Sequence, residues 1–437
     1  MKKIQKYAMA FLLGVMSFGF TACSDDNKGD DDVVNIPTAD MKAVAKTYVD
    51  DVVYPTYQEL AANAQTLYTK ASALYQAAEN GTMTQADIDA ACDAFKAARE
   101  QWERSEAFLY GSAENNELDP HIDSWPLDHD GLVSVLHNQT LINGFKSEDP
   151  AKFVGENNST NDAVQSVLGF HGMEFILFRD GANRQLAKLK QEYDDYDDMT
   201  DVKNLDELAF LQAVAGDVRN VTAFLEYTWL GAKTPSDVLA IVNGSASYLK
   251  GLVTTENGFA KGQYCWGDWF QMPGDGTGFG STWQATMKDL FVGGCSNICN
   301  EVQEQKLGQA YRCFHGEGAE DESRDYIESP YSQRSFVDYK DNIYSIQNSL
   351  YGTRDITAQP VANSMMNLLK NNSYPRYSAL QSALTEALAS FDAATAAQGS
   401  FVKNPGSEAV KNCIDKVKAL DDELNAAGKW IELQNAI

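Results

Sequence analysis

One short motif in the sequence places two potential ligands on the same side of a helix. The segment GFHGMEF starts at Gly169 and carries His171 and Glu174 three residues apart. Residues at this spacing share one helical face, so both side chains could contact one ligand, as Glu-x-x-His pairs do in carboxylate-bridged metal bundles. The spacing alone is weak evidence, because five histidines and 62 acidic residues produce roughly 0.7 such pairs by chance. A core histidine bonded to its own neighbour is the alternative interpretation.

Residues around the motif favour a ligand site over a purely structural pair. Residues 170–178 are apolar around His171 and Glu174. An unpaired buried carboxylate is costly, so Glu174 needs a partner or a cation there. Another carboxylate, Glu106, falls in a largely apolar helix end, and the segment DPHIDSWPLD at residues 119–128 is dense in potential ligands. We therefore expect these three segments to carry the chemistry.

Motifs of several common enzyme classes are missing from the sequence. It has no HExxH, HxxEH, GxSxG or GxxxxGK motif and no dinucleotide-binding fingerprint. Standard zinc peptidases need two histidines one helical turn apart and a third ligand, whereas His171 is followed at that distance by Phe175. The formal net charge of −27 repels phosphate backbones, so we expect no nucleic-acid partner.

The first residues predict export and a lipid anchor. Three lysines precede an apolar run at residues 7–20, which is too short to cross about 30 Å of hydrocarbon, and small residues then lead to Cys23. We expect residues 1–22 to be a lipoprotein signal peptide and Cys23 to carry the lipid. Phe20 departs from the usual lipobox, where leucine is commoner, so soluble secretion stays open. The acidic segment 23–39 has too little apolar surface to become ordered and is expected to be a disordered tether.

The rest of the chain is expected to be aqueous and to fold in an oxidising compartment. No other stretch approaches about 18 apolar residues, so contact with the membrane is expected through the lipid anchor alone. Of seven cysteines, six remain after lipidation, and an exported compartment permits disulfides. A bridge among Cys265, Cys295, Cys299 and Cys313 stays open, as does a zinc site of these cysteines with His315, which no CxxC pair supports.

Helical periodicity runs through nearly the whole chain, and no segment shows the two-residue alternation of a strand. From Met41 onward apolar residues recur at spacings of three and four, and about ten helices with modest loops favour bundles. Glycines crowd residues 258–280 and interrupt the pattern past its middle. We predict an all-α fold of two packed four-helix-bundle-like domains, an N-terminal bundle at 40–256 and a C-terminal bundle at 257–437.

Several ordered segments resemble one known family. WERSEAFLYG, DPHIDSWPLD, GFHGMEF and SPYSQRSFVDYKDNIYSIQNSLYG begin at residues 102, 119, 169 and 329 and look like the successive signature segments of the imelysin family. PTYQEL at residue 55 is similar as well. The resemblance covers about residues 41 to 430. Four segments in this order are far more specific than the GxHxxE motif that they include.

The resemblance implies two helical bundles with the GxHxxE site at their interface, in a periplasmic or outer-membrane protein. The family carries a metallopeptidase label, and related domains occur in iron-regulated bacterial proteins and in the periplasmic component of an elemental-iron uptake system. Matched by position, the site residues are Glu106, Asp123, Trp125, His171, Glu174, Ser329, Ser332 and Asp338. Arg334 stands where the family often has asparagine, and its guanidinium could pair with Glu174, pair with a bound anion, or lie outside the site.

We expect a binding protein that holds a metal ion, iron above all, or a metal-bearing ligand, and serves an iron-uptake system. It would be anchored by lipid to the outer membrane, on the periplasmic side or at the cell surface. Four side chains are the expected metal ligands, namely His171, Glu174, Glu106 and Asp123. Five others are expected to line the site, namely Trp125, Ser329, Tyr331, Ser332 and Asp338.

The donor set decides which metal is expected. Oxygen ligands with one imidazole suit iron or manganese better than zinc.

Two other functions stay open. One is a metallopeptidase in which Glu174 acts as the base toward a metal-bound water. The other is a surface lipoprotein that binds a peptide or protein partner and in which His171 and Glu174 are structural.

Overall fold

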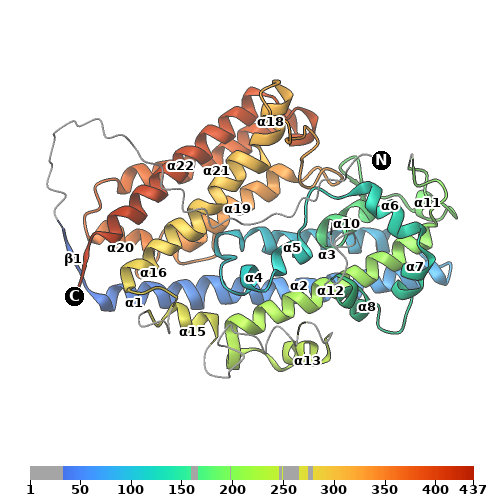
Figure 1. Cartoon of the computed structure of the whole chain (residues 1–437), viewed down its shortest axis with the longest axis horizontal. Coiled ribbons are helices and arrows are strands. Elements are labelled where there is room, and N and C mark those ends of the chain that lie inside the picture. Colours follow the sequence, from blue (N-terminus) through green and yellow to red (C-terminus); the bar gives the residue numbers. More distant parts are fainter. Residues whose placement is uncertain (1–32, 159–165, 197, 246–248, 250–264, 274–278) are drawn as a thin grey trace. The chain divides into compact units, whose positions relative to one another are not determined.

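Helices dominate the computed structural model, which describes residues 33–158, 166–196, 198–245, 249, 265–273 and 279–437 (Figure 1). The predicted all-α class is confirmed for this part of the chain. Cys23, the signal peptide and the tether up to residue 32 lie outside the described residues, as does the predicted domain boundary at 256/257. The anchor and the boundary therefore stay predictions.

The elements have the following bounds in chain order, with η marking short 3-10 or π segments. They are β1 Asn35–Ile36, α1 Thr38–Thr47, η1 Tyr48–Val53, α2 Tyr54–Glu79, α3 Gln85–Glu103, η2 Glu106–Phe108, α4 Ser112–Asn115, α5 Leu118–Ile122, α6 His129–His137, α7 Gln139–Phe145, α8 Pro150–Asn158, α10 Gly169–Leu177, β2 Phe178–Arg179, β3 Ala182–Asn183, α11 Leu186–Leu189, α12 Asn204–Leu230, η3 Gly231–Lys233, α13 Ser236–Gly244, α15 Trp266–Phe270, α16 Trp283–Asp289, η5 Leu290–Ser296, α17 Asn297–Glu301, η6 Val302–Lys306, α18 Gly308–Phe314, α19 Ser335–Tyr351, α20 Met365–Asn371, α21 Tyr377–Gln398, η7 Phe401–Lys403, α22 Glu408–Glu432 and β4 Asn435–Ala436.

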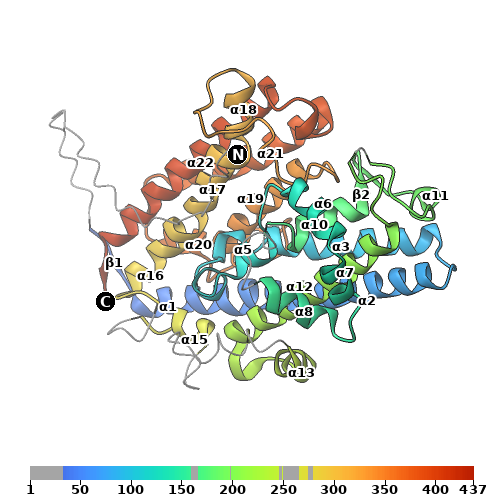
Figure 2. The same cartoon turned by 45° about the vertical axis from the view of Figure 1, so that its right-hand side comes forward.

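A long helical run at the N-terminus organises the first group of helices. α1, η1 and α2 follow one another without a break, and the run ends at Asn80 because Gly81 turns the chain with φ +70°. Thr84 then begins α3 with a capping box, in which Thr84 and Asp87 each accept a hydrogen bond from the other's backbone N–H. α2 packs against α3 and α12, and α12 packs against α8 and α10. Figures 1 and 2 show α2 and α12 side by side.

A second group of helices forms around α21 and α22, which pack against each other. α16 and η5 pack on α22, while α19 packs on α21 (Figure 2). α19 also contacts α3 and η2, so one helix joins the second group to the first. Residues Val34–Ile437 form one compact unit.

Strands play a minor part in the described fold. β1 pairs in parallel with β4, and β2 pairs with β3 in an antiparallel hairpin. None of the helices in the described ranges is long and apolar enough to span a bilayer. The six cysteines after Cys23 are all free thiols, so the bridge that the sequence left open is not present among them.

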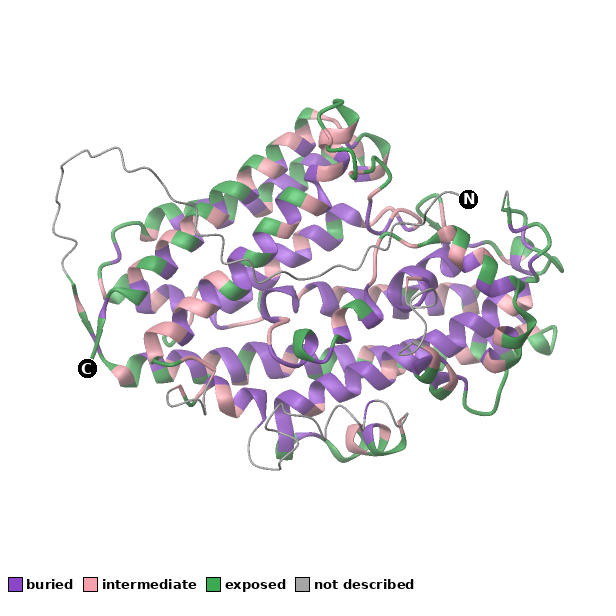
Figure 3. Cartoon of the chain, in the orientation of Figure 1, coloured by how far each residue is buried: buried purple, intermediate pink, exposed green. Residues whose placement is uncertain are grey.

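Buried residues follow the apolar helix faces, and Figure 3 shows α3, α10 and α12 buried along most of their length. The interior also holds charged side chains. Arg99 and Glu103 on α3 are both 0% exposed. Because an unpaired buried charge is costly, these groups must have partners nearby, and the partners define the site described next.

Candidate metal centre

The glycines of the GFHGMEF segment bring α10 against the end of α5. Gly169 has φ +69°, a conformation that glycine adopts easily, and a Cβ there would lie 2.1 Å from the carbonyl oxygen of Ile122. A Cβ on Gly172 would lie 2.1 Å from the carbonyl oxygen of Val167. Only glycine permits this close approach, which places His171 beside Asp123.

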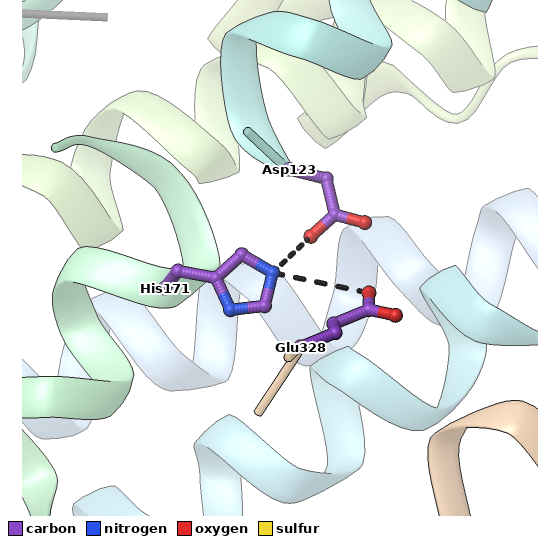
Figure 4. Close-up of side chains that lie close together, drawn as sticks. All are labelled: Asp123, His171 and Glu328. Atoms are coloured by element: carbon purple, nitrogen blue, oxygen red, sulfur yellow. Dashed lines mark ion pairs between the residues drawn. The ribbon is translucent and has the colours of Figure 1, made fainter. Parts of the chain in front are cut away.

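The imidazole of His171 is surrounded by carboxylates. Figure 4 shows Asp123, His171 and Glu328 with their polar ends directed toward one another. The Nε2 atom lies 3.1 Å from Oδ1 of Asp123 and 3.9 Å from Oε1 of Glu328. The Nδ1 atom lies 3.4 Å from Oε2 of Glu174. The Nε2 contacts are ion pairs by distance but are not aligned as hydrogen bonds, so this buried nitrogen has no hydrogen-bond partner in the described structure.

These carboxylates change the protonation of His171. Burial alone would disfavour the imidazolium, but the contacts with Asp123 and Glu174 outweigh it and raise the pKa of His171 to about 9. The ring is therefore protonated at neutral pH while no metal is bound. A metal ion that binds Nε2 must displace this proton.

Arg99 lies in the middle of the same cluster, and the sequence analysis did not include it. Its guanidinium pairs with four carboxylates, those of Glu103, Asp123, Glu328 and, at 3.9 Å, Asp338. Its Cζ lies 5.2 Å from the centroid of the Phe170 ring on α10. Burial opposes ionisation of Asp123, but Arg99 and His171 together hold the pKa of Asp123 well below its usual range. The indole Nε1 of Trp102 donates a 2.7 Å hydrogen bond to Oδ2 of Asp123.

The segment before α19 supplies the partners of Glu174. The backbone N–H and the hydroxyl of Ser332 both donate to Oε1 of Glu174 at 2.7 Å. The hydroxyl of Ser329 donates to Oδ2 of Asp338 at 2.6 Å. Ser329 has φ +53°, a strained conformation for a residue other than glycine. This turn directs the predicted serines toward the carboxylates.

Arg334 pairs with Asp338, which is none of the three positions that the sequence left open for its side chain. Its Nε lies 3.4 Å from Oδ1 of Asp338, one helical turn further on, and its side chain is 19% exposed. Burial raises the pKa of Asp338, while Arg334 and Arg99 lower it. Arg334 therefore contributes charge to the edge of the cluster through Asp338 rather than through Glu174.

The contacts recorded for Glu106, Trp125 and Tyr331 are with groups other than His171. Burial raises the pKa of Glu106 well above its usual range, although the charge of Lys306 acts to lower it. Among the described residues Glu106 has no ion pair with the imidazole of His171. The ring of Trp125 lies 5.6 Å from Nζ of Lys306. The ring of Tyr331 packs edge-on against Phe175 at 4.8 Å, on the neighbour of Glu174.

Carboxylates outnumber cations in the ion-pair cluster. The cluster has six carboxylates and four cationic side chains, namely Glu103, Asp123, Glu174, Glu301, Glu328 and Asp338 with Arg99, Lys306, Arg334 and His171. Two negative charges are thus in excess even with a protonated imidazole. Burial raises the pKa of Glu103, Glu301 and Asp338, so protons can neutralise the excess. A divalent cation would neutralise it equally well.

Donor atoms for such a cation are already close together. Asp123, His171 and Glu328 each offer one ligand atom, and these atoms lie within 4.8 Å of one another. Two carboxylate oxygens and one imidazole nitrogen suit a divalent cation such as Fe²⁺ or Mn²⁺. Nε2 of His171 makes no aligned hydrogen bond, whereas Oδ1 of Asp123 and Oε1 of Glu328 each accept one from Arg99. The residues therefore fit a metal ion.

Two of the residues that complete the centre had weak signals in the sequence. Arg99 lies on the apolar face of α3, three residues before Trp102 and four after Phe95. A cation on a buried face is a sign of a buried carboxylate partner. Glu328 directly precedes the SPYSQ segment, but nothing in its spacing relates it to His171.

Fold and centre together define an all-α protein with a buried histidine–carboxylate cluster beside α3, α10 and α19. Residues 53–426 match the family model described as Imelysin. Because this is most of the chain, the protein belongs to the imelysin family, and the resemblance found in the ordered segments is confirmed.

Similar proteins share parts or all of this fold. Iron-regulated protein A of Synechococcus elongatus is 40% identical over 131 residues, and the match spans 30% of this chain and 30% of that relative. The crystal structure of a putative iron-regulated protein A precursor from Parabacteroides distasonis has a TM-score of 0.66 at 23% identity, covering 91% of this chain and 96% of that one. An imelysin-like protein from Psychrobacter arcticum has a TM-score of 0.50 at 15% identity, covering 91% and 95%. The two structures support the fold alone.

Proposed function

We propose that this protein binds a divalent metal ion, with iron as the physiological cargo, at the buried centre around His171. One observation carries the proposal: Asp123, His171 and Glu328 direct ligand atoms to within 4.8 Å of one another, and Nε2 of His171 has no hydrogen-bond partner among the described residues. A buried imidazole nitrogen facing two carboxylates offers the nitrogen and oxygen donors that divalent metal ions take in proteins.

The electrostatics of the centre support a cation as the ligand. Two carboxylates are in excess over the cationic groups, and a charge excess of this kind is stable in the interior only when protons or a cation neutralise it. Glu174 supports the site, since it contacts Nδ1 of His171 and is itself held by Ser332. Hydrogen bonding of the second ring nitrogen to a carboxylate is the usual way in which proteins orient a metal-binding histidine.

Iron is the proposed cargo for two reasons. Oxygen donors with one imidazole suit iron or manganese better than zinc. In addition, two similar proteins carry the name iron-regulated protein A, one from Synechococcus elongatus and one from Parabacteroides distasonis. We propose that the protein serves iron uptake, attached to the outer membrane by a lipid on Cys23.

Metal analysis tests the proposal directly. Wild-type protein purified without chelator should contain iron or take up Fe²⁺ and Mn²⁺ by calorimetry at neutral pH, and His171→Ala should lose this binding while keeping its helical dichroism. His137→Ala is the matched control, because His137 is partly exposed and pairs with Asp201 away from the centre. Wild-type protein that binds neither ion would refute the proposal. Loss of binding in both variants would refute the assignment of His171.

The metallopeptidase alternative assigns Glu174 as the base, and the contacts of Glu174 do not favour it. One carboxylate oxygen accepts two hydrogen bonds from Ser332, and the other faces His171. Both oxygens of Glu174 are therefore already engaged by protein groups, which disfavours a role as the base toward a metal-bound water. We expect no cleavage of an unfolded substrate above background, and cleavage that disappears in Glu174→Gln would reverse this conclusion.

A further inference from the structure

Lys306 is a second buried cation that contacts the candidate centre, and neither the motif nor the ligand set accounts for it. Its side chain is 1% exposed. Its Nζ lies 3.0 Å from Oε2 of Glu328, 3.7 Å from Oε1 of Glu301 and 4.0 Å from Oε2 of Glu103. Three carboxylates therefore surround one ammonium group.

Glu328 connects this lysine to the imidazole. One of its carboxylate oxygens faces Nε2 of His171 at 3.9 Å, and the other faces Nζ of Lys306 at 3.0 Å. The second oxygen has no aligned hydrogen bond among the described residues, although it is buried. Charge alone holds Lys306 to Glu328. A metal ion bound by Glu328 and the ammonium of Lys306 thus compete for the same carboxylate.

The groups around Lys306 differ in their exposure. The side chains of Glu103 and Glu328 are 0% exposed. The side chain of Glu301 is 23% exposed, and the half-buried ring of Trp125 lies 5.6 Å from Nζ. Lys306 therefore contacts both fully buried carboxylates and a carboxylate that reaches the solvent.

Arg99 is not displaceable in the same way. Its planar guanidinium contacts four buried carboxylates at once and packs over the ring of Phe170. Lysine differs because its ammonium is a compact charge on a flexible four-carbon chain and can exchange one acceptor for another by rotation of that chain. Glu301 is an acceptor already within 3.7 Å.

We propose that Lys306 is the internal counter-ion that an incoming divalent cation displaces: its ammonium moves from Glu328 toward Glu301, and the freed carboxylate binds the ion. This inference rests on the proposed metal-binding function and assigns Lys306 the role of a positioning residue that sets the affinity. Without metal, Lys306 stabilises the buried Glu328. With metal, it pairs with Glu301, the more exposed of its three carboxylates.

Substitution of Lys306 separates this role from a structural one. Lys306→Met removes the competing charge, so Mn²⁺ should bind at least about tenfold more tightly than to wild type, while Lys306→Arg, which keeps the charge, should bind no more tightly than wild type. Lys288→Met is the matched control, because Lys288 pairs with Glu432 and with none of the centre's carboxylates, and it should leave the affinity unchanged. Weaker or equal binding to folded Lys306→Met would overturn the proposal.

A measurement on wild-type protein does not depend on whether Lys306→Met folds. Acetylation of lysines by acetic anhydride, followed by mass spectrometry, should show Lys306 reacting several-fold faster with saturating Mn²⁺ than without it, while Lys288 is unchanged. Displacement toward Glu301, whose side chain is 23% exposed, gives the reagent access. Unchanged or slower reaction of Lys306 would overturn the proposal. Absence of Mn²⁺ and Fe²⁺ binding in both wild type and Lys306→Met would refute the metal-binding function as well, whereas binding with no Lys306 effect would refute this inference alone.

Discussion

The proton on His171 should make metal binding strongly dependent on pH. In the metal-free protein the pKa of His171 is raised to about 9 by Asp123 and Glu174, against the effect of burial. The metal needs the Nε2 lone pair, so below pH 9 each bound ion must release this proton. The dissociation constant should therefore rise about tenfold for each unit of pH lost, or about 100-fold between pH 8 and pH 6, which corresponds to about 2.7 kcal/mol. Release of further protons from buried carboxyls such as Glu103 would steepen the slope.

Calorimetry can count this proton. Mn²⁺ should be titrated into wild type at pH 6, 7 and 8, in buffers of different ionisation enthalpy, so that the number of released protons is obtained independently of the affinity. Any Mn²⁺ binding that remains in His171→Ala should be much weaker, and where it can be measured its slope of log Kd against pH should be smaller than that of wild type by one proton. A wild-type affinity that does not change between pH 6 and pH 8, or equal slopes in the two proteins, would refute the reasoning.

The proton on His171 weakens metal binding at low pH, but it stabilises the folded metal-free protein there. The folded pKa of His171, about 9, exceeds the ordinary value of 6.5. The stabilisation is therefore complete below pH 6.5 and disappears as the pH rises from 6.5 to 9, a loss of about 3 kcal/mol. Urea denaturation at pH 6 and pH 9 in the presence of chelator should show this loss in wild type and a smaller one in His171→Ala.

Three further predictions concern single residues. Gly169→Ala should lower the free energy of unfolding by more than about 2 kcal/mol, because a Cβ would lie 2.1 Å from a backbone oxygen. Gly81 has a similar φ and nothing within 4 Å of its Cβ position, so Gly81→Ala should cost only the free energy of the unfavourable backbone conformation. Equal losses of the two variants in urea denaturation would contradict the packing argument. Ser332→Ala should cost about 2 kcal/mol, since it removes one hydrogen bond to the buried carboxylate of Glu174 and leaves the backbone one, and a change within error would contradict this. Cys23→Ser should abolish membrane association, and protein that stays with membranes after a carbonate wash would show that no lipid on Cys23 anchors it.

Local pattern was sufficient to predict the all-α class, and it selected His171 and Glu174 of the candidate centre. Helical periodicity is visible in residues three and four positions apart in the sequence. His171 and Glu174 lie three positions apart on one helix, so their proximity is visible in the same way. Asp123 was predicted because its segment is dense in ligands and belongs to the family's ordered segments. Ser332 and Glu174 are 158 residues apart in the sequence. Only the position of Ser332 in a segment that resembles the family indicated that it belongs to the site.

The charges that balance the centre could not be predicted in this way. Arg99, Lys306 and Glu328 lie on α3, on η6 and before α19, and only the packing of these elements brings the three side chains together. A single cation in a helix is usually solvated, so its sequence position does not distinguish a buried guanidinium from an exposed one. Arg334 illustrates the same limit, since its partner proved to be Asp338 and not Glu174.

Burial of the centre also bears on the kind of ligand that it can receive. Asp123, His171, Glu174 and Glu328 are between 0% and 5% exposed. A peptidase must present its metal and base to an extended polypeptide, and that would require helices α3, α10 and α19 to separate. The proposed metal ion would enter as a small charge and replace charges already present, with rotation of side chains such as Lys306. The excess of carboxylates makes the exchange favourable, since protons leave as the ion enters. Burial of these four side chains therefore favours the proposed metal ion over an extended polypeptide as the ligand of the centre.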